Sequence, residues 1–175
     1  KTKDANYITT ELSRENDIIL YRDLPTLNVK RVWLDLIKEL ELKKFMVINP
    51  LECYDICASK YLTDVYLKEN GLLTPKTSYI NNISDSQRAF ESLNTKFPIV
   101  LKQSVGSQTG IGVVILESMR SLDATVQMGY YMELPLIVQE YIKTDYDVRV
   151  IVLDGEIKGA MKRKIITNDF RSNVS

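Results

Sequence analysis

The order of apolar runs along the chain limits its possible folds more than any other feature of the sequence. Residues 18–21 and 45–48 are short apolar runs typical of buried strands. Between them, apolar residues recur at helical spacing from Val29 to Leu40, and Asn28 is placed to cap the start of this helix. Two parallel strands need a long connection, so this order of strand, helix and strand predicts a parallel crossover unit at the start of the chain.

The next part of the sequence alternates between helical and strand patterns. A helix is expected over about residues 59–70, and Gly71 is placed to end it at the C′ position. The residues expected to face inward from this helix are Leu62, Val65 and Tyr66. The remaining elements expected here are strands at 77–80, 97–101, 112–116 and from 136, and helices at 84–93 and 118–131.

The segment from Asp147 to Lys164 has a different pattern. Valines at every second position from Val148 alternate with other strand formers, and Asp154-Gly155 supplies the favoured residues of a type I′ turn. This pattern predicts an antiparallel hairpin. Because an α/β beginning is followed by antiparallel strands, the sequence predicts an α+β fold rather than a continuous doubly wound sheet.

Length and charge exclude several classes of protein. The 175 residues are enough for one domain, or one and a fraction. Lys and Arg number 23, as do Asp and Glu, so no net charge draws the chain toward nucleic acid. No apolar run approaches the roughly 20 residues that a bilayer span requires. A cytoplasmic protein is expected, with no membrane partner and no direct nucleic-acid signal.

The absence of histidine restricts the chemistry of any site. It excludes Ser-His-Asp and Cys-His arrangements and a His-ligated zinc ion within this chain. Acid–base work would fall to carboxylates, lysines or tyrosines. The cysteines Cys53 and Cys57 are too few for a tetrahedral metal site, and we expect them to be reduced thiols of an intracellular protein.

The strongest local signal for chemistry is the segment 102–113, which has a strand pattern on each side. It contains Gly106, Gly110 and Gly112 together with three hydroxyl residues. Glycines let the backbone approach a polyphosphate and aim N–H groups at it, while Lys102 supplies a positive charge. The segment is neither a Walker A motif nor a Rossmann turn, because Gly112 leads into a strand rather than a helix. A glycine hairpin that is merely flexible is the open alternative.

Polar residues downstream suit a nucleoside. The strand that begins at residue 136 turns polar near Glu140, where Tyr141 and Ile142 follow. An adenine needs an apolar slot with backbone donors and acceptors at a strand edge, and a ribose needs a carboxylate for its hydroxyls. Glu140, Tyr141, Ile142 and Asp147 together can supply both.

These segments, taken in order, resemble the RimK-type ATP-grasp family of ATP-dependent carboxylate–amine ligases. The resemblance runs from about Asp17 to Ser175. The matching segments are Ser59-Lys60, Ile99-Val100-Leu101-Lys102, Gly110-Ile111-Gly112-Val113, Gln139-Glu140-Tyr141-Ile142-Lys143, Asp147-Val148-Arg149 and Asp169-Phe170-Arg171-Ser172-Asn173. The glycine hairpin is one residue longer than is usual in the family, because Thr109 separates Gln108 from Gly110.

The resemblance implies an ATP-grasp fold, incomplete in this chain and preceded by part of an α/β domain. Residues 1–57 would be the C-terminal part of this pre-ATP-grasp domain. Residues 58–135 would form the small ATP-grasp subdomain with its phosphate hairpin, and residues 136–175 would begin the large subdomain. The sequence ends before the region in which the family keeps its magnesium-binding acidic residues, so no metal ligand is expected within this chain.

The resemblance also implies a set of site residues. Lys60 and Lys102 would approach the ATP phosphates, and Asp147 would lie near the ribose. Arg171 would neutralise charge on the transferred phosphoryl group, and Arg149 would either do the same or bind a substrate carboxylate. The other implied nucleotide contacts are Gly106, Ser107, Gly110, Ile111 and Gly112 in the hairpin, Gln139, Glu140, Tyr141 and Ile142 around the adenine and ribose, and Ser172 and Asn173 near the phosphates.

In such enzymes the γ-phosphate of ATP passes to a substrate carboxylate, and an amine then displaces it. The implied cofactors are ATP and Mg²⁺, with Mn²⁺ as an alternative metal. The implied partners are a carboxylate substrate, which in some members is a protein C-terminus, and an amine such as glutamate. Assembly as a homo-oligomer is a further expectation.

Other functions stay open. The chain could be an ATP-grasp remnant that binds a nucleotide or a partner protein without catalysis, or an ATP-grasp kinase. Single residues also have plainer roles: Lys60 as a solvated first-turn lysine, Tyr141 as a core aromatic, and Arg149 as a salt-bridging strand residue. The basic run 162–164 can bind an acidic peptide or phosphates, or simply protect a strand edge.

Overall fold

The computed structural model describes residues 11–21, 27–105 and 112–165, and side chains from residue 31 onward in the first helix. The chain divides into two compact units, Lys1–Cys57 and Ala58–Ser175. Each unit has its own strands, and each is described by itself below.

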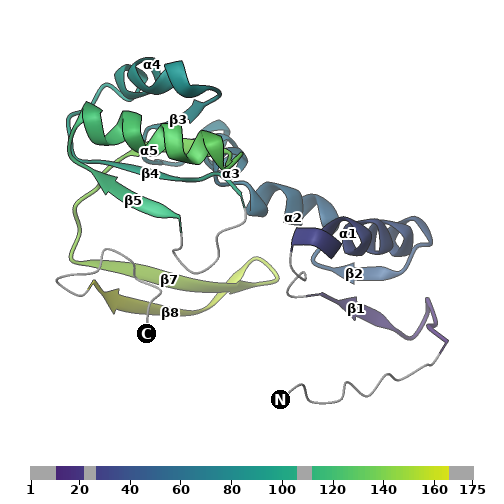
Figure 1. The fold of residues 1–175 in the computed structure, drawn as a ribbon. Helices are drawn as coiled ribbons and strands as arrows, with labels where there is room; N and C mark the ends of the chain where they lie inside the picture. The colour runs from purple at the N-terminus through teal and green to yellow at the C-terminus, as the bar shows by residue number, and fades with distance from the viewer. Residues whose placement is uncertain (1–10, 22–26, 106–111, 166–175) are drawn as a thin grey trace, which may run out of the picture. The chain divides into compact units, whose positions relative to one another are not determined.

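The first unit contains the predicted crossover. Strands β1 (Ile18–Leu20) and β2 (Met46–Ile48) pair in parallel, joined by helix α1 (Leu27–Leu42) (Figure 1). Helix α1 begins at Leu27, so Asn28 is already inside the helix and is not its N-cap. Helix α2 (Leu51–Ala58) follows β2 and carries Cys53 and Cys57, whose thiols are free and exposed.

The second unit is built on an antiparallel sheet with the strand order β3-β6-β4-β5. Its strands are β3 (Thr77–Ile80), β4 (Ile99–Gln103), β5 (Val113–Leu116) and β6 (Leu136–Glu140). Strand β6 pairs with both β3 and β4 and therefore lies inside this sheet. Its hydrogen bonds join β6 to strands that precede residue 136, and the subdomain boundary at that residue stays a prediction.

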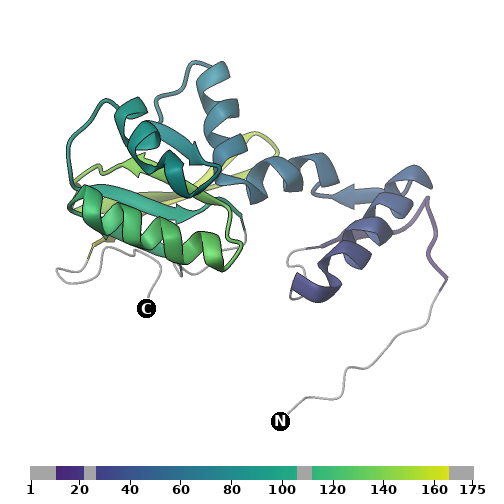
Figure 2. The ribbon, with the colours of Figure 1, turned by 45° about the horizontal axis from the view of Figure 1, so that its top comes forward.

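One face of this sheet is covered by helices. The short 3₁₀ helix η1 (Ile83–Asp85) leads into α4 (Ser86–Ser92), and α5 (Met119–Tyr131) follows β5 and lies along the sheet (Figure 2). Helix α5 begins at the N-cap Ser118, whose hydroxyl forms a capping box with Ser121. The residues that form the core between helices and sheet are Ile80, Ala89, Leu93, Ile99, Leu101, Leu116, Leu122, Val126, Leu136 and Val138. Their burial supplies most of the stabilisation of this unit.

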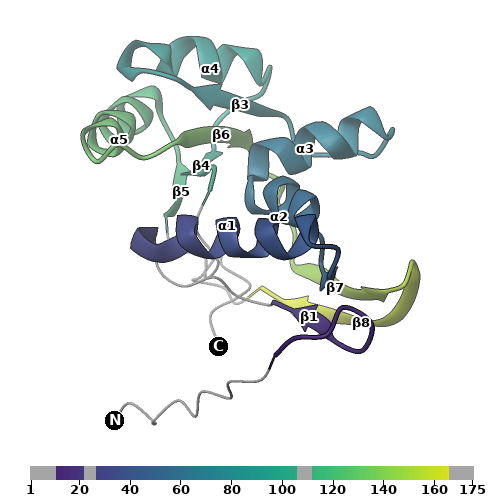
Figure 3. The same ribbon diagram turned by 90° about the vertical axis from the view of Figure 1, so that its right-hand side faces the viewer.

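Helix α3 (Lys60–Glu69) lies beside β3 (Figure 3), and Tyr61 of α3 packs edge-on against Tyr79 at 5.2 Å between ring centroids. The predicted ends of α3 are confirmed: the Ser59 hydroxyl accepts the N–H of Leu62, and Gly71 has φ +72°. The N–H of Gly71 donates to the carbonyl of Lys68, as in a Schellman cap.

The predicted inward face of α3 is wrong for Leu62 and Tyr66, while Val65 is half-buried. Leu62 and Tyr66 are 42% and 48% exposed, whereas Asp64 is 5% exposed. A buried carboxylate is tolerated because Lys68, one turn later, pairs with it at 2.6 Å. The helix itself was predicted correctly, but two of the three apolar residues expected to face inward are exposed.

Strands β7 (Tyr146–Leu153) and β8 (Glu156–Lys164) form the predicted hairpin as a separate two-stranded sheet. Asp154 and Gly155 have φ values of +53° and +71°, as a type I′ turn requires. The register shifts between Ile151 and Val152, so that one residue of β8 is left without a partner in β7.

Candidate functional site

The face of the sheet opposite to α4 and α5 carries a row of polar side chains across three strands. Lys102 Nζ on β4 donates to Gln139 Oε1 on β6 at 2.5 Å, and Gln139 Nε2 donates to Thr77 Oγ1 on β3 at 2.7 Å. These residues share a face because Thr77 pairs with Gln139 and Gln139 pairs with Val100, two residues before Lys102. The row fixes the position of the Lys102 ammonium group.

Lys60 stands at the start of α3, and its own backbone ties that start to β4. The N–H of Lys60 donates to the carbonyl of Ser104 at 2.9 Å, and Ser59 forms a β-bridge with Val105. The first turn of α3 is thereby held next to the end of β4. The positive end of the helix dipole at such a helix start favours an anion.

The two lysines lie close enough to influence each other electrostatically. Burial lowers the pKa of Lys60. The pKa of Lys102 is lowered by burial first and by the charge of Lys60 second, while the carboxylate of Asp64 raises it. The two lysines that we assigned to the phosphates thus stand on elements that are bonded to each other, and two partly desolvated ammonium groups suit a polyanion.

The glycine segment is described only at its ends. Gly112 has φ +75°, and a Cβ atom there would lie 3.1 Å from Gln103 Oε1. Its carbonyl accepts the N–H of Gln103, and Lys102 pairs with Val113, so the predicted strands on each side of the segment are antiparallel neighbours. Gly106, Ser107, Gly110 and Ile111, which we assigned to the phosphates, lie outside the described residues.

The end of β6 has its polar residue held in place. Glu140 Oε1 accepts the N–H of Lys76 at 2.9 Å, and the N–H of Glu140 donates to the carbonyl of Lys76. Tyr141 and Ile142 follow and are exposed. Tyr141 is therefore not a core aromatic, and both side chains are accessible to a ligand.

The hairpin brings Asp147 together with a residue that we did not assign to the site. Arg163 donates to Asp147 through two bonds, Nε to Oδ1 at 2.8 Å and Nη2 to Oδ2 at 2.7 Å. Arg149 lies two residues further on the same face of β7 and is exposed. Among the described residues Arg149 forms no ion pair, so its plainer role as a salt-bridging residue is not seen.

A bulge explains why the sequence did not reveal Arg163. An unbroken hairpin from the Asp154-Gly155 turn would place Asp147 opposite Lys162, whereas the register shift places it opposite Arg163. Lys162 instead lies over the ring of Tyr146, 3.7 Å from its centroid. The basic run thus contributes an internal partner as well as surface charge.

The remaining predicted residues are not placed by the structure. Arg171, Ser172 and Asn173 lie outside the described residues, so the convergence of Arg149 and Arg171 stays a prediction. Within residues 11–21, 27–105 and 112–165, no group of three or more Cys, Asp or Glu residues is arranged to hold a metal ion.

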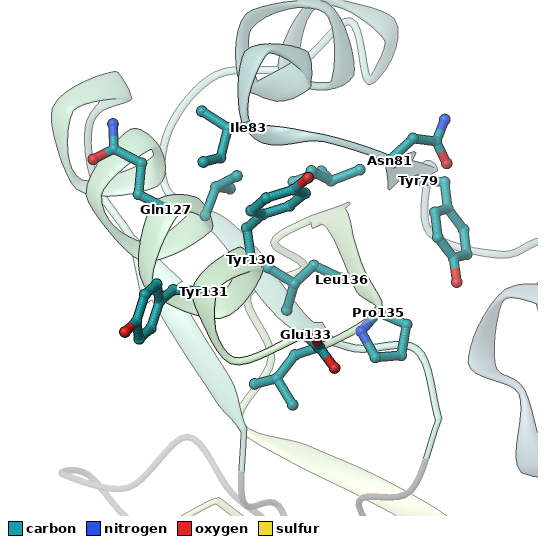
Figure 4. Close-up of a pocket in the computed structure, with 12 residues that line it drawn as sticks. Tyr79, Asn81, Ile83, Gln127, Tyr130, Tyr131, Glu133, Pro135 and Leu136 are labelled. Atoms are coloured by element: carbon teal, nitrogen blue, oxygen red, sulfur yellow. The ribbon is translucent and has the colours of Figure 1, made fainter.

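A cavity of about 770 Å³ lies away from these residues, between β3, the C-terminal half of α5 and the segment that enters β6. Figure 4 shows Tyr130 projecting over it, with Asn81 and Gln127 at its rim. None of the predicted site residues lines this cavity. Size alone therefore does not identify the site, and we place the candidate site at the lysines.

No helix in the described part of the chain is long and apolar enough to cross a membrane.

Comparison with curated proteins gives named relatives. The chain is 32% identical over 143 residues to the coenzyme γ-F420-2:α-L-glutamate ligase of Methanococcus maripaludis, which covers 79% of this chain and 48% of the relative. It is 27% identical over 140 residues to a probable α-L-glutamate ligase of Teredinibacter turnerae, covering 79% of this chain and 46% of the relative. The chain therefore spans about half the length of these relatives.

Solved structures share the fold. The RimK domain ATP-grasp protein of Sphaerobacter thermophilus matches with a TM-score of 0.63 at 20% identity, over 76% of this chain and 51% of that one. The N5-carboxyaminoimidazole synthetase of Staphylococcus aureus, solved with ADP, matches with a TM-score of 0.62 at 14% identity. The match covers 74% of this chain and 36% of that one. The predicted ATP-grasp fold is confirmed. Because residues 57–175 also match the RimK-like ATP-grasp domain, the chain belongs to the RimK-like ATP-grasp family.

Proposed function

We propose that this chain provides the nucleotide-binding part of an ATP-dependent carboxylate–amine ligase. The observation that carries the proposal is that the start of α3, with Lys60, is bonded to the end of β4, whose Lys102 is oriented by Gln139. Two ammonium groups beside a helix start form a site for a polyphosphate. Names of relatives as glutamate ligases support the choice of reaction class.

The protein's part in the reaction is to position the nucleotide and balance charge. Lys60 and Lys102 would hold the phosphates. The exposed Tyr141 and Ile142 would contact the adenine, and Glu140 and Asp147 would contact the ribose. Arg149 and Arg171 would stabilise charge that develops during transfer. The glycine segment, including Gly106, Ser107, Gly110, Ile111 and Gly112, would close over the phosphates, with Ser172 and Asn173 beside them.

The proposed reaction has two steps. The substrate carboxylate attacks the γ-phosphorus of ATP, which forms an acyl phosphate and releases ADP. The amine of an amino acid such as glutamate then attacks the acyl carbon and expels inorganic phosphate, leaving an amide and a proton for solvent. Mg²⁺, or Mn²⁺, would screen the phosphates when bound with ATP; the described residues offer no carboxylate set for it, and we assign no protein ligand to it.

The acceptor in this proposal is a peptide or small-molecule carboxylate. A protein C-terminus, a homo-oligomeric state and a cytoplasmic location stay predictions.

The first test is nucleotide affinity, measured by calorimetry with ATP and Mg²⁺. Lys102→Ala should weaken ATP binding by about 1.5–3 kcal/mol, roughly 10- to 150-fold, because a charge-assisted bond to phosphate is lost. Lys96→Ala removes an exposed lysine elsewhere in the same unit and should leave the affinity unchanged. Equal affinities for wild type and Lys102→Ala would remove Lys102 from the site.

A further inference from the structure

The row of polar side chains on the sheet does not end at Thr77 but continues to a backbone carbonyl. Lys102 Nζ donates to Gln139 Oε1 at 2.5 Å, and Gln139 Nε2 donates to Thr77 Oγ1 at 2.7 Å. The Thr77 hydroxyl in turn donates to the carbonyl of Pro75 at 3.0 Å. The hydrogen bonds therefore run from an ammonium group to a carbonyl, and the two groups between them each donate and accept.

The chemistry of the two end groups fixes the direction of every bond in this row. An ammonium group only donates, so the atom of the Gln139 amide that faces Lys102 must be its oxygen. The amide nitrogen then faces Thr77 and needs an acceptor there. Thr77 can accept because the Pro75 carbonyl, which cannot donate, takes the hydroxyl proton. The hydroxyl of Thr77 thus determines which end of the Gln139 amide faces Lys102.

The register of the strands brings these three side chains together. Thr77 lies directly opposite Gln139 in the antiparallel pair of β3 and β6. Lys102 pairs with Ile137, so it is a diagonal neighbour of Gln139 across β4 and β6. Lys102, Gln139 and Thr77 are all half-buried, and a polar group that loses its partner in such a place is costly.

We propose that Thr77 is a positioning residue of the nucleotide site: its hydroxyl keeps the oxygen of the Gln139 amide toward Lys102, and Gln139 thereby holds the Lys102 ammonium group for a phosphate. A reversed amide would set two donors against each other, and Lys102 would lose its acceptor. The proposal rests on the proposed function and deepens it, because Thr77 acts on the lysine from β3, with β6 between them.

The decisive experiment is a double-mutant cycle on ATP affinity, measured by calorimetry with Mg²⁺. Thr77→Val keeps the β-branched shape and leaves Gln139 Nε2 without its acceptor. It should weaken ATP binding about 2- to 10-fold, as expected for the loss of one hydrogen bond. In a Gln139→Leu background the same substitution should have no further effect, because Thr77 acts only through that amide.

Two variants separate positioning from general stability. Thr77→Ser retains the hydroxyl and should keep the wild-type affinity. Thr125→Val removes a half-buried hydroxyl that donates within α5, to the carbonyl of Ser121, and should also leave the affinity unchanged. The proposal is overturned if Thr77→Val costs as much in the Gln139→Leu background as in wild type, or if it costs nothing in wild type.

A second measurement needs no nucleotide. The side-chain NH₂ group of Gln139 is assigned in ¹H–¹⁵N spectra as the pair of signals that Gln139→Leu removes. In Thr77→Val this pair should shift and exchange with water faster, since its hydrogen bond is lost, and in Thr77→Ser it should stay as in wild type. An unchanged pair in Thr77→Val overturns the proposal, also where Gln139→Leu binds ATP too weakly for calorimetry.

Folding and nucleotide binding are checked separately. If the backbone amide signals show that Thr77→Val does not fold, Thr77→Ala takes its place in both measurements. Failure of wild type to bind ATP would contradict the proposed function, and the nucleotide-free spectra would still decide whether Thr77 orients Gln139.

Discussion

The four-stranded sheet and the β7–β8 hairpin contain similar residues in very different surroundings. Leu136 and Val138 of β6 are 4% and 0% exposed, whereas Val150 and Ile151 of β7 are 45% and 60% exposed. Both regions are antiparallel and rich in β-branched residues, which favour strands. The difference lies in the helices: α4 and α5 cover one face of the sheet, and among the described residues no comparable layer is packed on the hairpin. Strand-forming residues thus specify that the strands pair, while their burial depends on whether helices from elsewhere in the chain cover the sheet.

The same contrast applies to how the two regions hold their polar residues. In the sheet, Lys102 and Gln139 are fixed on a rigid face whose other side is the core. In the hairpin, Asp147 is fixed by a guanidinium from the neighbouring strand. The sheet therefore orients its site through packing, and the hairpin through a local ion pair.

The largest effect is expected in the core of the sheet. Leu122 of α5 is fully buried in the core, and Leu122→Ala should lower the free energy of unfolding by about 2–5 kcal/mol, because a cavity remains where the side chain is removed. Urea unfolding followed by far-UV circular dichroism measures it. A loss below that range would mean that the helix-covered face is loosely packed.

The hairpin should be most sensitive at its turn. Gly155 has φ +71°, which a side chain disfavours, so Gly155→Ala should cost roughly 1–2 kcal/mol. Hydrogen exchange of the β7 and β8 amides should accelerate while that of β6 stays slow. Equal acceleration in both regions would show that they open as a single cooperative unit.

The ion pair of the hairpin should contribute less. A double-mutant cycle with Asp147→Asn and Arg163→Gln should give a coupling energy of about 0.5–1 kcal/mol, since both side chains are partly exposed. The same amide exchange measures it. A coupling of zero would remove this pair as the element that orients Asp147.

The smallest effect is expected on the exposed face of the hairpin. Ile151→Ser should change the free energy of unfolding by no more than about 0.5 kcal/mol, as for other exposed positions. The result is compared with Leu122→Ala under the same conditions. A cost approaching that of the core variant would show that this face is covered in solution.

Much of the second unit was predictable because its boundaries are set by neighbouring residues. Ser59 and Ser118 begin helices, Gly71 ends one, and Asp154-Gly155 forms a turn, each through bonds or dihedral preferences within a few residues. The family was also evident from ordered short segments, and the comparisons confirm it. Such signals do not depend on the rest of the fold.

Only the tertiary structure decided which of these elements meet. Strand β6 enters between β3 and β4 because it forms hydrogen bonds with both, and these partners are distant in sequence. Asp64 rather than Leu62 is buried on α3, and Lys68 compensates its charge. Asp147 meets Arg163 rather than Lys162 because one bulged residue shifts the register. The sequence alone determined where helices, strands and turns lie, since short-range bonds set them; the site needed the fold, since its contacts join residues that only long-range packing brings together.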